Sequence, residues 1–157
     1  MDKFEELAQN PRERIDVKIQ RLNENAVLPS YAHPTDAGAD VSACEEVTIN
    51  PGETKLVGTG LKVAIPSGYE ITLRPRSGMS LKTGLRIANS PATIDSDYRG
   101  EIKVPLYNDS DKVQSLDNKE RVAQLVIMPY LNVTFNEVDN LSESNRDQGG
   151  FGSTGTK

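Results

Sequence analysis

The chain has 157 residues, which is enough for one domain with a proper hydrophobic core. Its 23 acidic and 18 basic residues give a net charge of -5, which repels a phosphate backbone and argues against nucleic acid as a partner. No apolar run approaches the length of a signal-peptide core or a membrane span, so we expect a cytoplasmic protein without membrane contact. Cys44 is the only cysteine, which excludes an internal disulfide, and its apolar neighbours indicate a buried thiol.

Sequence periodicity predicts an all-β domain. Residues 2–9 fit a short amphipathic helix that Pro11 ends, and from Ile15 the apolar period changes from 3.6 to 2. Short strands separated by turn residues are expected at 15–19, 47–49, 54–65, 69–73, 85–88, 101–108, 121–128 and 131–138. Since no helices alternate with these strands, the pattern favours a sandwich or barrel.

One stretch, residues 77–83 (SGMSLKT), lacks strand alternation and fits about two turns of helix, with Ser77 as the N-cap and Gly84 past the end. A helix N-terminus presents unpaired N–H groups and a partial positive charge. Arg76 before the helix and Gly78 in its first turn would therefore suit a phosphate. An ordinary capped helix preceded by an arginine accounts for the same residues.

Two carboxylates and a tyrosine stand between expected strands in residues 91–100 (PATIDSDYRG). A carboxylate such as Asp95, fixed by a hairpin, can activate a water because the backbone sets its angle of approach. Tyr98 can offer a flat face to a sugar ring. The stretch on its own also fits a polar hairpin turn, and both interpretations stay open.

Three further segments carry polar groups whose function the residues alone do not decide. Asp36 and Asp40 could order water on a divalent cation or form a solvated turn. His33 is the only histidine, so any metal would be oxygen-bound and magnesium-like. Gln124 lies on a strand, where it could face a ligand or solvent. Residues 146–155 (RDQGGFGSTG) could wrap a phosphate or form a mobile terminus.

Taken in order, five segments closely resemble the five motifs of the trimeric dUTPases (deoxyuridine triphosphate nucleotidohydrolases). They are DAGADV (36–41), PRSGMS (75–80), ANSPATIDSDYRGE (88–101), RVAQLVIMP (121–129) and RDQGGFGSTG (146–155). The resemblance covers about residues 17–155. It implies a jelly-roll-like β fold with a flexible glycine-rich arm and a homotrimer with active sites shared between subunits. The expected divisions are an N-terminal extension (1–14), a β-domain (15–140) and an arm that closes the site (141–157).

The resemblance implies hydrolysis of dUTP to dUMP and pyrophosphate with Mg²⁺, which limits uracil incorporation into DNA and supplies dUMP for dTMP synthesis. By position, Asp95 would activate the water that attacks the α-phosphate, and Tyr98 would pack under the deoxyribose and exclude a 2′-hydroxyl. Asp40 would act on the magnesium through water. The other implied substrate contacts are Arg76, Ser77, Gly78 and Gln124 for phosphates, Asn89, Thr93, Ile94 and Lys103 along a uracil-reading hairpin, and Arg146, Phe151, Gly152, Ser153 and Thr154 in the arm.

Two positions differ from the usual family pattern, because Ala92 and Asp147 stand where glycine is usual. A positive φ at position 92 would cost alanine about 1 kcal/mol, and Asp147 adds a negative charge near the implied phosphate clamp. Two alternative functions remain. A dCTP deaminase-type relative would need another acid near the base, and residues 71–94 contain none. A non-hydrolytic nucleotide-binding homologue would be expected to lose Asp95 or the glycine-rich arm.

Overall fold

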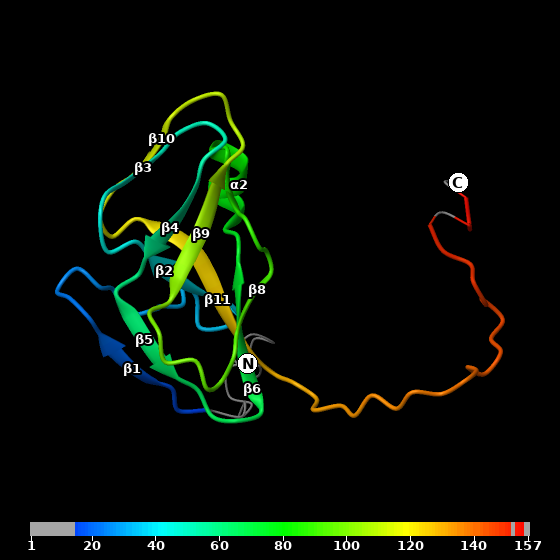
Figure 1. The fold of residues 1–157 in the computed structure, drawn as a ribbon. Coiled ribbons are helices and arrows are strands. Elements are labelled where there is room, and N and C mark those ends of the chain that lie inside the picture. Colours follow the sequence, from blue (N-terminus) through cyan, green and yellow to red (C-terminus); the bar gives the residue numbers. More distant parts are fainter. Residues whose placement is uncertain (1–14, 152, 156–157) are drawn as a thin grey trace, which may run out of the picture.

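The computed structural model describes residues 15–151 and 153–155, and this part of the chain is nearly all β (Figure 1). Its strands are β1 (Lys18–Arg21), β2 (Ala39–Ser42), β3 (Val47–Ile49), β4 (Thr54–Gly58), β5 (Leu61–Ala64), β6 (Tyr69–Arg74), β7 (Leu85–Ile87), β8 (Ala92–Ile94), β9 (Lys103–Asn108), β10 (Gln114–Leu116) and β11 (Arg121–Pro129). Its one helix, α2 (Ser77–Lys82), lies between β6 and β7. The predicted all-β class with one short helix is therefore confirmed.

Two larger sheets enclose the core. The four-stranded sheet has the order β2-β11-β6-β8 and the three-stranded sheet the order β4-β9-β7, while β1 pairs with β5 and β3 with β10. Both larger sheets contribute to one cluster of buried side chains, with Leu73 and Leu125 from the first and Val57 and Leu106 from the second. Burying these side chains together supplies the main favourable free energy of folding, at roughly 25 cal/mol per Å² of apolar surface.

The predicted strand 54–65 is in fact two strands that belong to different sheets. β4 pairs with β9, whereas β5 pairs with β1. The chain changes sheet at Gly60, whose φ of 68° is a conformation that other residues adopt only with strain. A Cβ at Gly60 would also lie 2.9 Å from the Cβ of Ala26 and 2.9 Å from Nδ2 of Asn23. Side-chain periodicity continues through this corner, which is why the sequence did not reveal the break.

The expected hairpin around Asp95 is also corrected by the structure. β8 pairs with β6 and β9 pairs with β4 and β7, so the loop from Asp95 to Ile102 connects two sheets. The residues had predicted two adjacent strands correctly, but local sequence does not state which strands pair. The loop is therefore held from two sheets at once.

The strand predicted at 131–138 is wrong. The backbone of Tyr130 still bonds to Gly68, but the chain then leaves the body without strand geometry (Figure 1). The alternating residues Leu131, Val133 and Phe135 are 88%, 56% and 92% exposed. A strand requires a hydrogen-bonding neighbour, and the described part of this single chain provides none to this segment.

Several smaller expectations can be compared directly with the structure. Cys44 is buried, as predicted. The predicted strand 15–19 begins later in the structure, at Lys18 of β1. Ile19, which lies in this strand, is 38% exposed. β10 was not predicted. The helix expected at 2–9 lies outside the described residues, and no helix within them is long and apolar enough to cross a membrane.

Two backbone predictions near the site also need correction. Ser77 is the first residue of α2 and not its N-cap; Arg76 occupies that position and makes no capping side-chain bond. Ala92 has no positive φ, because it is a buried residue of β8 paired with Leu73. Alanine at position 92 is therefore unstrained, and its methyl group contributes to the core.

The turn at residues 50–53 forms as its Pro-Gly sequence predicts. Gly52 takes a φ of 72°, and the N–H of Glu53 donates to the carbonyl of Asn50 at 3.0 Å. The Glu53 carboxylate in turn accepts the N–H of Asn50 at 2.8 Å, and this hydrogen bond lowers the pKa of Glu53.

Gly60 and Gly52, two of the described glycines with positive φ, provide a matched test of the corner between β4 and β5. Gly60→Ala should lower the free energy of unfolding by about 3 kcal/mol, because it adds a steric clash to backbone strain. Gly52→Ala should cost only about 1 kcal/mol, since a Cβ there meets no atom within 4 Å. Urea denaturation of both variants measures the difference, and equal losses would contradict the role of the corner.

Candidate functional site

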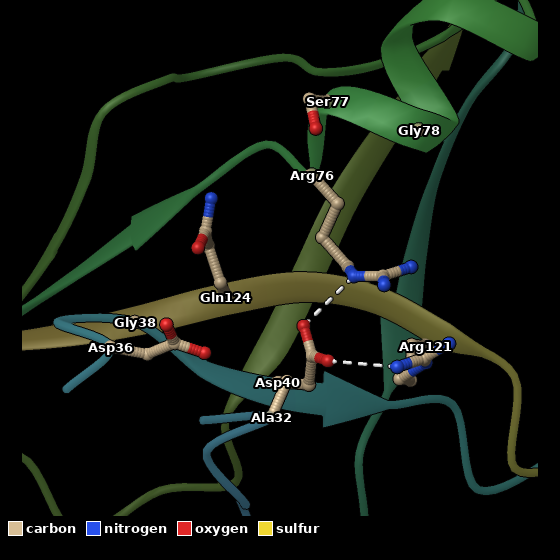
Figure 2. Close-up of a pocket in the computed structure, with 9 residues that line it drawn as sticks. All are labelled: Ala32, Asp36, Gly38, Asp40, Arg76, Ser77, Gly78, Arg121 and Gln124. Atoms are coloured by element: carbon tan, nitrogen blue, oxygen red, sulfur yellow. Dashed lines mark hydrogen bonds and ion pairs between the residues drawn. The ribbon is translucent and has the colours of Figure 1, made fainter. Parts of the chain in front are cut away.

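The register of the four-stranded sheet aligns polar residues from three strands. Asp40 on β2 pairs with Gln124 on β11, and Gln124 pairs with Arg74 at the end of β6. The chain after Arg74 turns into α2. A cavity of about 330 Å³ forms where these strand ends meet the helix. It is lined by Ala32, Asp36, Gly38, Asp40, Arg76, Ser77, Gly78, Arg121 and Gln124 (Figure 2).

The Asp40 carboxylate lies between two guanidinium groups. Its Oδ1 accepts a hydrogen bond from Nε of Arg76 at 2.8 Å, and its Oδ2 accepts one from Nη1 of Arg121 at 3.1 Å (Figure 2). The side chain of Asp40 is only 16% exposed. A part-buried carboxylate shared by two cations is strongly oriented, and it fixes both guanidiniums at the cavity.

Gln124 is positioned by a close backbone contact. Its Nε2 donates to the carbonyl of Pro75 at 2.9 Å, which ties β11 to the turn before α2. Its Oε1 lies against the Cα of Gly38, where an added Cβ would clash with it. Gly38 is therefore required by packing, and the pair holds the Arg76 turn in place.

The start of α2 lines the cavity with exposed residues. Ser77 and Gly78 are both exposed, and a Cβ added at Gly78 would meet no atom within 4 Å. The backbone at Gly78 has no positive φ, so neither conformation nor packing within the chain requires a glycine there. Space left open beside free helix N–H groups suits the close approach of a phosphate.

The lining of the cavity offers no aromatic or large apolar surface for a base to stack on, and its arginines suit phosphates. None of the lining residues is aromatic or a large apolar residue. Its two acids, Asp36 and Asp40, balance its two arginines, so the lining carries no net charge. A polyphosphate would therefore need further positive charge, from another chain segment or from a cation.

A hard divalent cation fits these donors through water. Among the described residues, no group of three or more His, Cys, Asp or Glu side chains lies close enough to hold a metal ion. Asp36 and Asp40 offer carboxylate oxygens, but Asp40 already accepts two guanidinium bonds. Magnesium keeps several waters and binds through one or two carboxylates together with substrate phosphates, which matches this set.

The loop that follows β8 fixes a carboxylate and an aromatic ring. The N–H of Tyr98 donates to the carbonyl of Asp95 at 3.1 Å, which closes a turn, and Nη1 of Arg99 donates to the carbonyls of Ser96 and Tyr98. The Tyr98 hydroxyl donates to the carbonyl of Glu101 at 3.0 Å. The Tyr98 ring covers Gly100 so closely that a Cβ there would clash with it. Asp95 and Tyr98 are both exposed on this braced turn.

The strand before this turn has one open edge. β8 is the last strand in the order β2-β11-β6-β8, so one side of its backbone is not paired within that sheet. Thr93 lies exposed and Ile94 half-buried on β8, and Asn89 is exposed in the connection that precedes it. Lys103, at the start of β9, forms an ion pair with Glu101 at 3.6 Å. Unpaired N–H and C=O groups of this kind can read the edge of a base.

A single chain keeps the carboxylate loop and the cavity apart. β8 lies three strand spacings from β2, which is roughly 14 Å at about 4.8 Å per spacing. Ile94 pairs with Ile71, whereas Gln124 of the cavity pairs with Arg74, so Asp95 lies about four residues, or roughly 13 Å, further along the sheet. Together these offsets place Asp95 about 20 Å from Asp40, which lines the cavity. No residue of the Asp95 loop lines the cavity.

The predicted arm residues also lie away from the cavity. Figure 1 shows the chain beyond β11 extending from the body, with its end far from the sheets. Arg146 donates from Nε to the carbonyl of Gly149 at 2.7 Å, and Phe151, Ser153 and Thr154 are exposed. Gly152 lies outside the described residues. One chain therefore does not bring the arm to the other predicted site residues.

Sequence comparison identifies the family. A sequence model of the dUTPase family matches residues 24–155. The chain belongs to the dUTPase family. The deoxyuridine 5'-triphosphate nucleotidohydrolase of Nautilia profundicola is 50% identical over 139 residues, which cover 88% of this chain and 98% of that protein. The protein of the same name from Thermobifida fusca is 49% identical over 142 residues, covering 90% of this chain and 79% of that protein.

Solved structures of dUTPases share the fold. A mutant dUTPase of Staphylococcus bacteriophage 80alpha, with dUpNHpp, matches with a TM-score of 0.84 at 31% identity, covering 90% of this chain and 99% of that one. A mutant dUTPase from phage phi11 of S. aureus, in which a structural Mg(II) ion is coordinated, matches with a TM-score of 0.76 at 27% identity, covering 82% of this chain and 99% of that one. The predicted jelly-roll-like fold is thereby confirmed.

The structure adds one residue to the predicted dUTPase-family site. Arg121 lines the cavity, although its position three residues before Gln124 places the two on opposite faces of a regular strand. A register shift between Arg121 and Ala123 interrupts the regular alternation, so that Arg121 and Gln124 both line the cavity. In the sequence, this irregularity corresponds to two adjacent apolar residues, Val122 and Ala123, where strict alternation would place one polar residue.

The open space at Gly78 generates a prediction for this dUTPase-family chain. Gly78→Ala should fold as well as the parent, because alanine is favoured over glycine within a helix by about 1 kcal/mol. Its methyl group should nevertheless raise the Kd for inorganic pyrophosphate by about tenfold or more, by blocking approach to the helix N-terminus. Calorimetric titration and thermal unfolding measure both effects. Lys82→Ala, in the last turn of the same helix, is the control and should leave the Kd unchanged.

Proposed function

We propose that this chain hydrolyses dUTP to dUMP and pyrophosphate. The observation that carries the proposal is the combination of a polar cavity lined by two arginines with an exposed carboxylate on a braced turn, in a chain of the dUTPase family. The reaction would remove dUTP before uracil enters DNA and would supply dUMP for dTMP synthesis. We place it in the cytoplasm, where a buried free thiol such as Cys44 stays reduced.

Asp95 would act as the general base. Its carboxylate would accept a proton from a water whose oxygen attacks the α-phosphorus, while the bond to the bridging oxygen breaks and pyrophosphate leaves. The hydrogen bond between the Tyr98 N–H and the Asp95 carbonyl fixes the backbone that carries this carboxylate. Tyr98 would pack against the deoxyribose, since its ring is held over Gly100 and leaves one face outward. A ribose 2′-hydroxyl would then have no room.

The uracil would be read along the open edge of β8. Thr93 and Ile94 lie on that edge, and Asn89 and Lys103 flank it. The alternation of N–H and C=O groups along an unpaired strand matches the donor and acceptor edge of uracil. Phe151 would stack on the exposed face of the base when the arm closes.

The phosphates would occupy the cavity at the start of α2. Arg76 would donate from its remaining guanidinium N–H groups, and Ser77 and Gly78 from the helix N-terminus. Gln124 would hold the turn that carries Arg76 and offer its second amide N–H. Arg146, Gly152, Ser153 and Thr154 would cover the terminal phosphate and exclude water.

Magnesium is the cation we propose for this site, with Asp40 acting on it through water. When bound, it would neutralise charge on the phosphates and so favour departure of pyrophosphate. The proposal that a cation is needed is supported by the lining of the cavity, which carries no net charge to offset that of a polyphosphate.

We further propose that each active site is shared between copies of the chain in a homotrimer. The separation of about 20 Å between Asp95 and Asp40 supports this, together with the absence of every Asp95-loop residue from the cavity lining, since an in-line attack on a phosphate held in the cavity requires the carboxylate beside it. The exposed apolar residues Leu131, Val133 and Phe135 also favour contact with another chain.

Substrate selectivity tests the proposed reaction. With Mg²⁺, the protein should release pyrophosphate from dUTP and much more slowly from dTTP, dCTP and UTP, and a chelator should abolish the release. Asp95→Asn should retain folding and nucleotide binding but lose at least about 10²-fold in kcat, the usual contribution of a general base. Asp97→Asn, two residues away on the same loop, is the control. Cleavage of no nucleotide by the folded protein would refute the proposal.

Mixing two inactive variants tests the shared site. Asp95→Asn lacks the base and Arg76→Ala lacks a phosphate ligand, so each should be inactive alone. In mixed trimers, one of the three shared sites would combine an intact Asp95 from one chain with an intact Arg76 from another, restoring about a third of the wild-type rate. The two variants are co-expressed with different affinity tags so that mixed assemblies can be isolated. Mixed assemblies without activity would show that both residues act from one chain.

A further inference from the structure

Glu101 lies near the end of the loop that carries Asp95 and Tyr98, and none of the roles proposed above falls to it. We propose that Glu101 is a positioning residue that sets the selectivity for deoxyribose over ribose, by holding Tyr98 against the corner between β4 and β5. This inference rests on the proposed dUTP hydrolysis and adds a residue that acts through Tyr98. It is argued from the hydrogen bonds of Glu101 and from the space that its side chain occupies.

The Tyr98 ring is held by the backbone that follows it. Tyr98 is 46% exposed, so packing covers only part of its side chain. Its hydroxyl donates to the carbonyl of Glu101 at 3.0 Å, which fixes the far end of the ring. The ring also lies over Gly100, where an added Cβ would clash with it. The position of the ring therefore follows the backbone at Gly100 and Glu101.

The Glu101 side chain ties that backbone to the corner. Its Oε1 accepts the N–H of Gly60 at 2.9 Å, and the side chain is only 23% exposed. A Cβ added at Gly58 would lie 2.8 Å from the same oxygen, so the carboxylate occupies space that a glycine leaves free. A hydrogen bond to a charged acceptor is stronger than one between neutral groups. Through its side chain and its carbonyl, Glu101 thus joins the corner to Tyr98.

Other bonds hold the fold at this corner without Glu101. The carbonyl of Ile102 accepts bonds from the N–H of Thr59 at 3.3 Å and from its Oγ1 at 2.7 Å. The N–H of Ile102 donates to the carbonyl of Leu61 at 2.8 Å, and the Ile102 side chain is buried. The ion pair of Glu101 with Lys103 is long, at 3.6 Å, and contributes little to stability. We therefore expect Glu101 to fix the loop, while the neighbouring bonds keep the chain folded.

Selectivity for the sugar is sensitive to small movements of this ring. In the proposed reaction, Tyr98 packs against the deoxyribose and leaves no room for a 2′-hydroxyl. A displacement of about 1 Å in such a contact can change a rate by about 10²-fold. Without the bond to Gly60, the Glu101 carbonyl can move and the Tyr98 hydroxyl moves with it, so a ribose gains room. Because dUTP and UTP share the base and the phosphates, the ratio of their rates reports on the sugar contact.

Two substitutions at Glu101 separate reach from charge. Glu101→Asp keeps the charge but is one methylene too short to reach the N–H of Gly60, whereas Glu101→Gln keeps the acceptor oxygen and loses the charge. The ratio of kcat/KM for dUTP to kcat/KM for UTP should fall by about tenfold or more in Glu101→Asp. In Glu101→Gln the ratio should stay within about threefold of the parent value, since the hydrogen bond is weakened but kept.

Thr59→Val is the matched control, because it removes the neighbouring bond to the Ile102 carbonyl at the same corner. It should lower the midpoint of thermal unfolding without changing the ratio. Tyr98→Phe, which loses the hydroxyl bond, should lower the ratio much as Glu101→Asp does. The double variant should show little further loss, because both changes release the same ring.

The proposal is overturned if Glu101→Asp lowers the unfolding midpoint but leaves the ratio at the parent value. It is also overturned if the effects of Glu101→Asp and Tyr98→Phe on the logarithm of the ratio add in the double variant. If the parent protein cleaves no nucleotide, the proposed reaction is refuted. The ratio of the Kd for UMP to the Kd for dUMP, measured by calorimetry in the same variants, then still tests Glu101, and equal Kd values in the parent would overturn its role.

Discussion

The Asp40 carboxylate is the group on which the cavity at the start of α2 depends. Its two oxygens bind Arg76 and Arg121, and so join β2 to the turn before α2 and to the start of β11. Without this carboxylate the two guanidiniums would face each other uncompensated, and without either guanidinium a part-buried negative charge would remain. The bond from Gln124 to Pro75 fixes the same turn from a second direction. The cavity is therefore arranged before a ligand arrives, which lowers the entropy lost on binding.

The same sheet that builds the cavity keeps the Asp95 loop away from it. Asp40 and Gln124 occupy one row of the sheet, and the register of β8 against β6 places Asp95 several residues further along and beyond β6. Neither position can move without breaking a ladder of backbone hydrogen bonds. In the proposed homotrimer, symmetry would complete the site by bringing the loop of one copy to the cavity of another. In that assembly catalysis would depend on association of the chains, and dilution below the dissociation constant of the trimer would lower activity without unfolding the chain.

The sequence predicted most elements because its local signals are strong. Alternation identified β9 and β11, and the Pro-Gly turn at residues 50–53 forms as expected. It could not predict which strands pair, since that depends on contacts distant in the chain, so the Asp95 loop was expected to be a hairpin. Likewise, it could not distinguish Gly38, which packing against Gln124 requires, from Gly78, which nothing within the chain requires. The bulge that recruits Arg121 left only two adjacent apolar residues as a trace.

The backbone of the arm explains one departure from the family pattern. Asp147 has a φ of 45°, in the left-handed region where glycine is most at ease, which accounts for the usual glycine at this position. Aspartate is among the residues that enter this region most readily, because its short polar side chain can bond to nearby backbone. The turn is kept by the bonds from the Asp147 N–H to Ser144 and from the Gly149 N–H to the Arg146 carbonyl. Aspartate is therefore compatible with the shape of the turn, and in the proposed phosphate clamp it would place a negative charge beside Arg146.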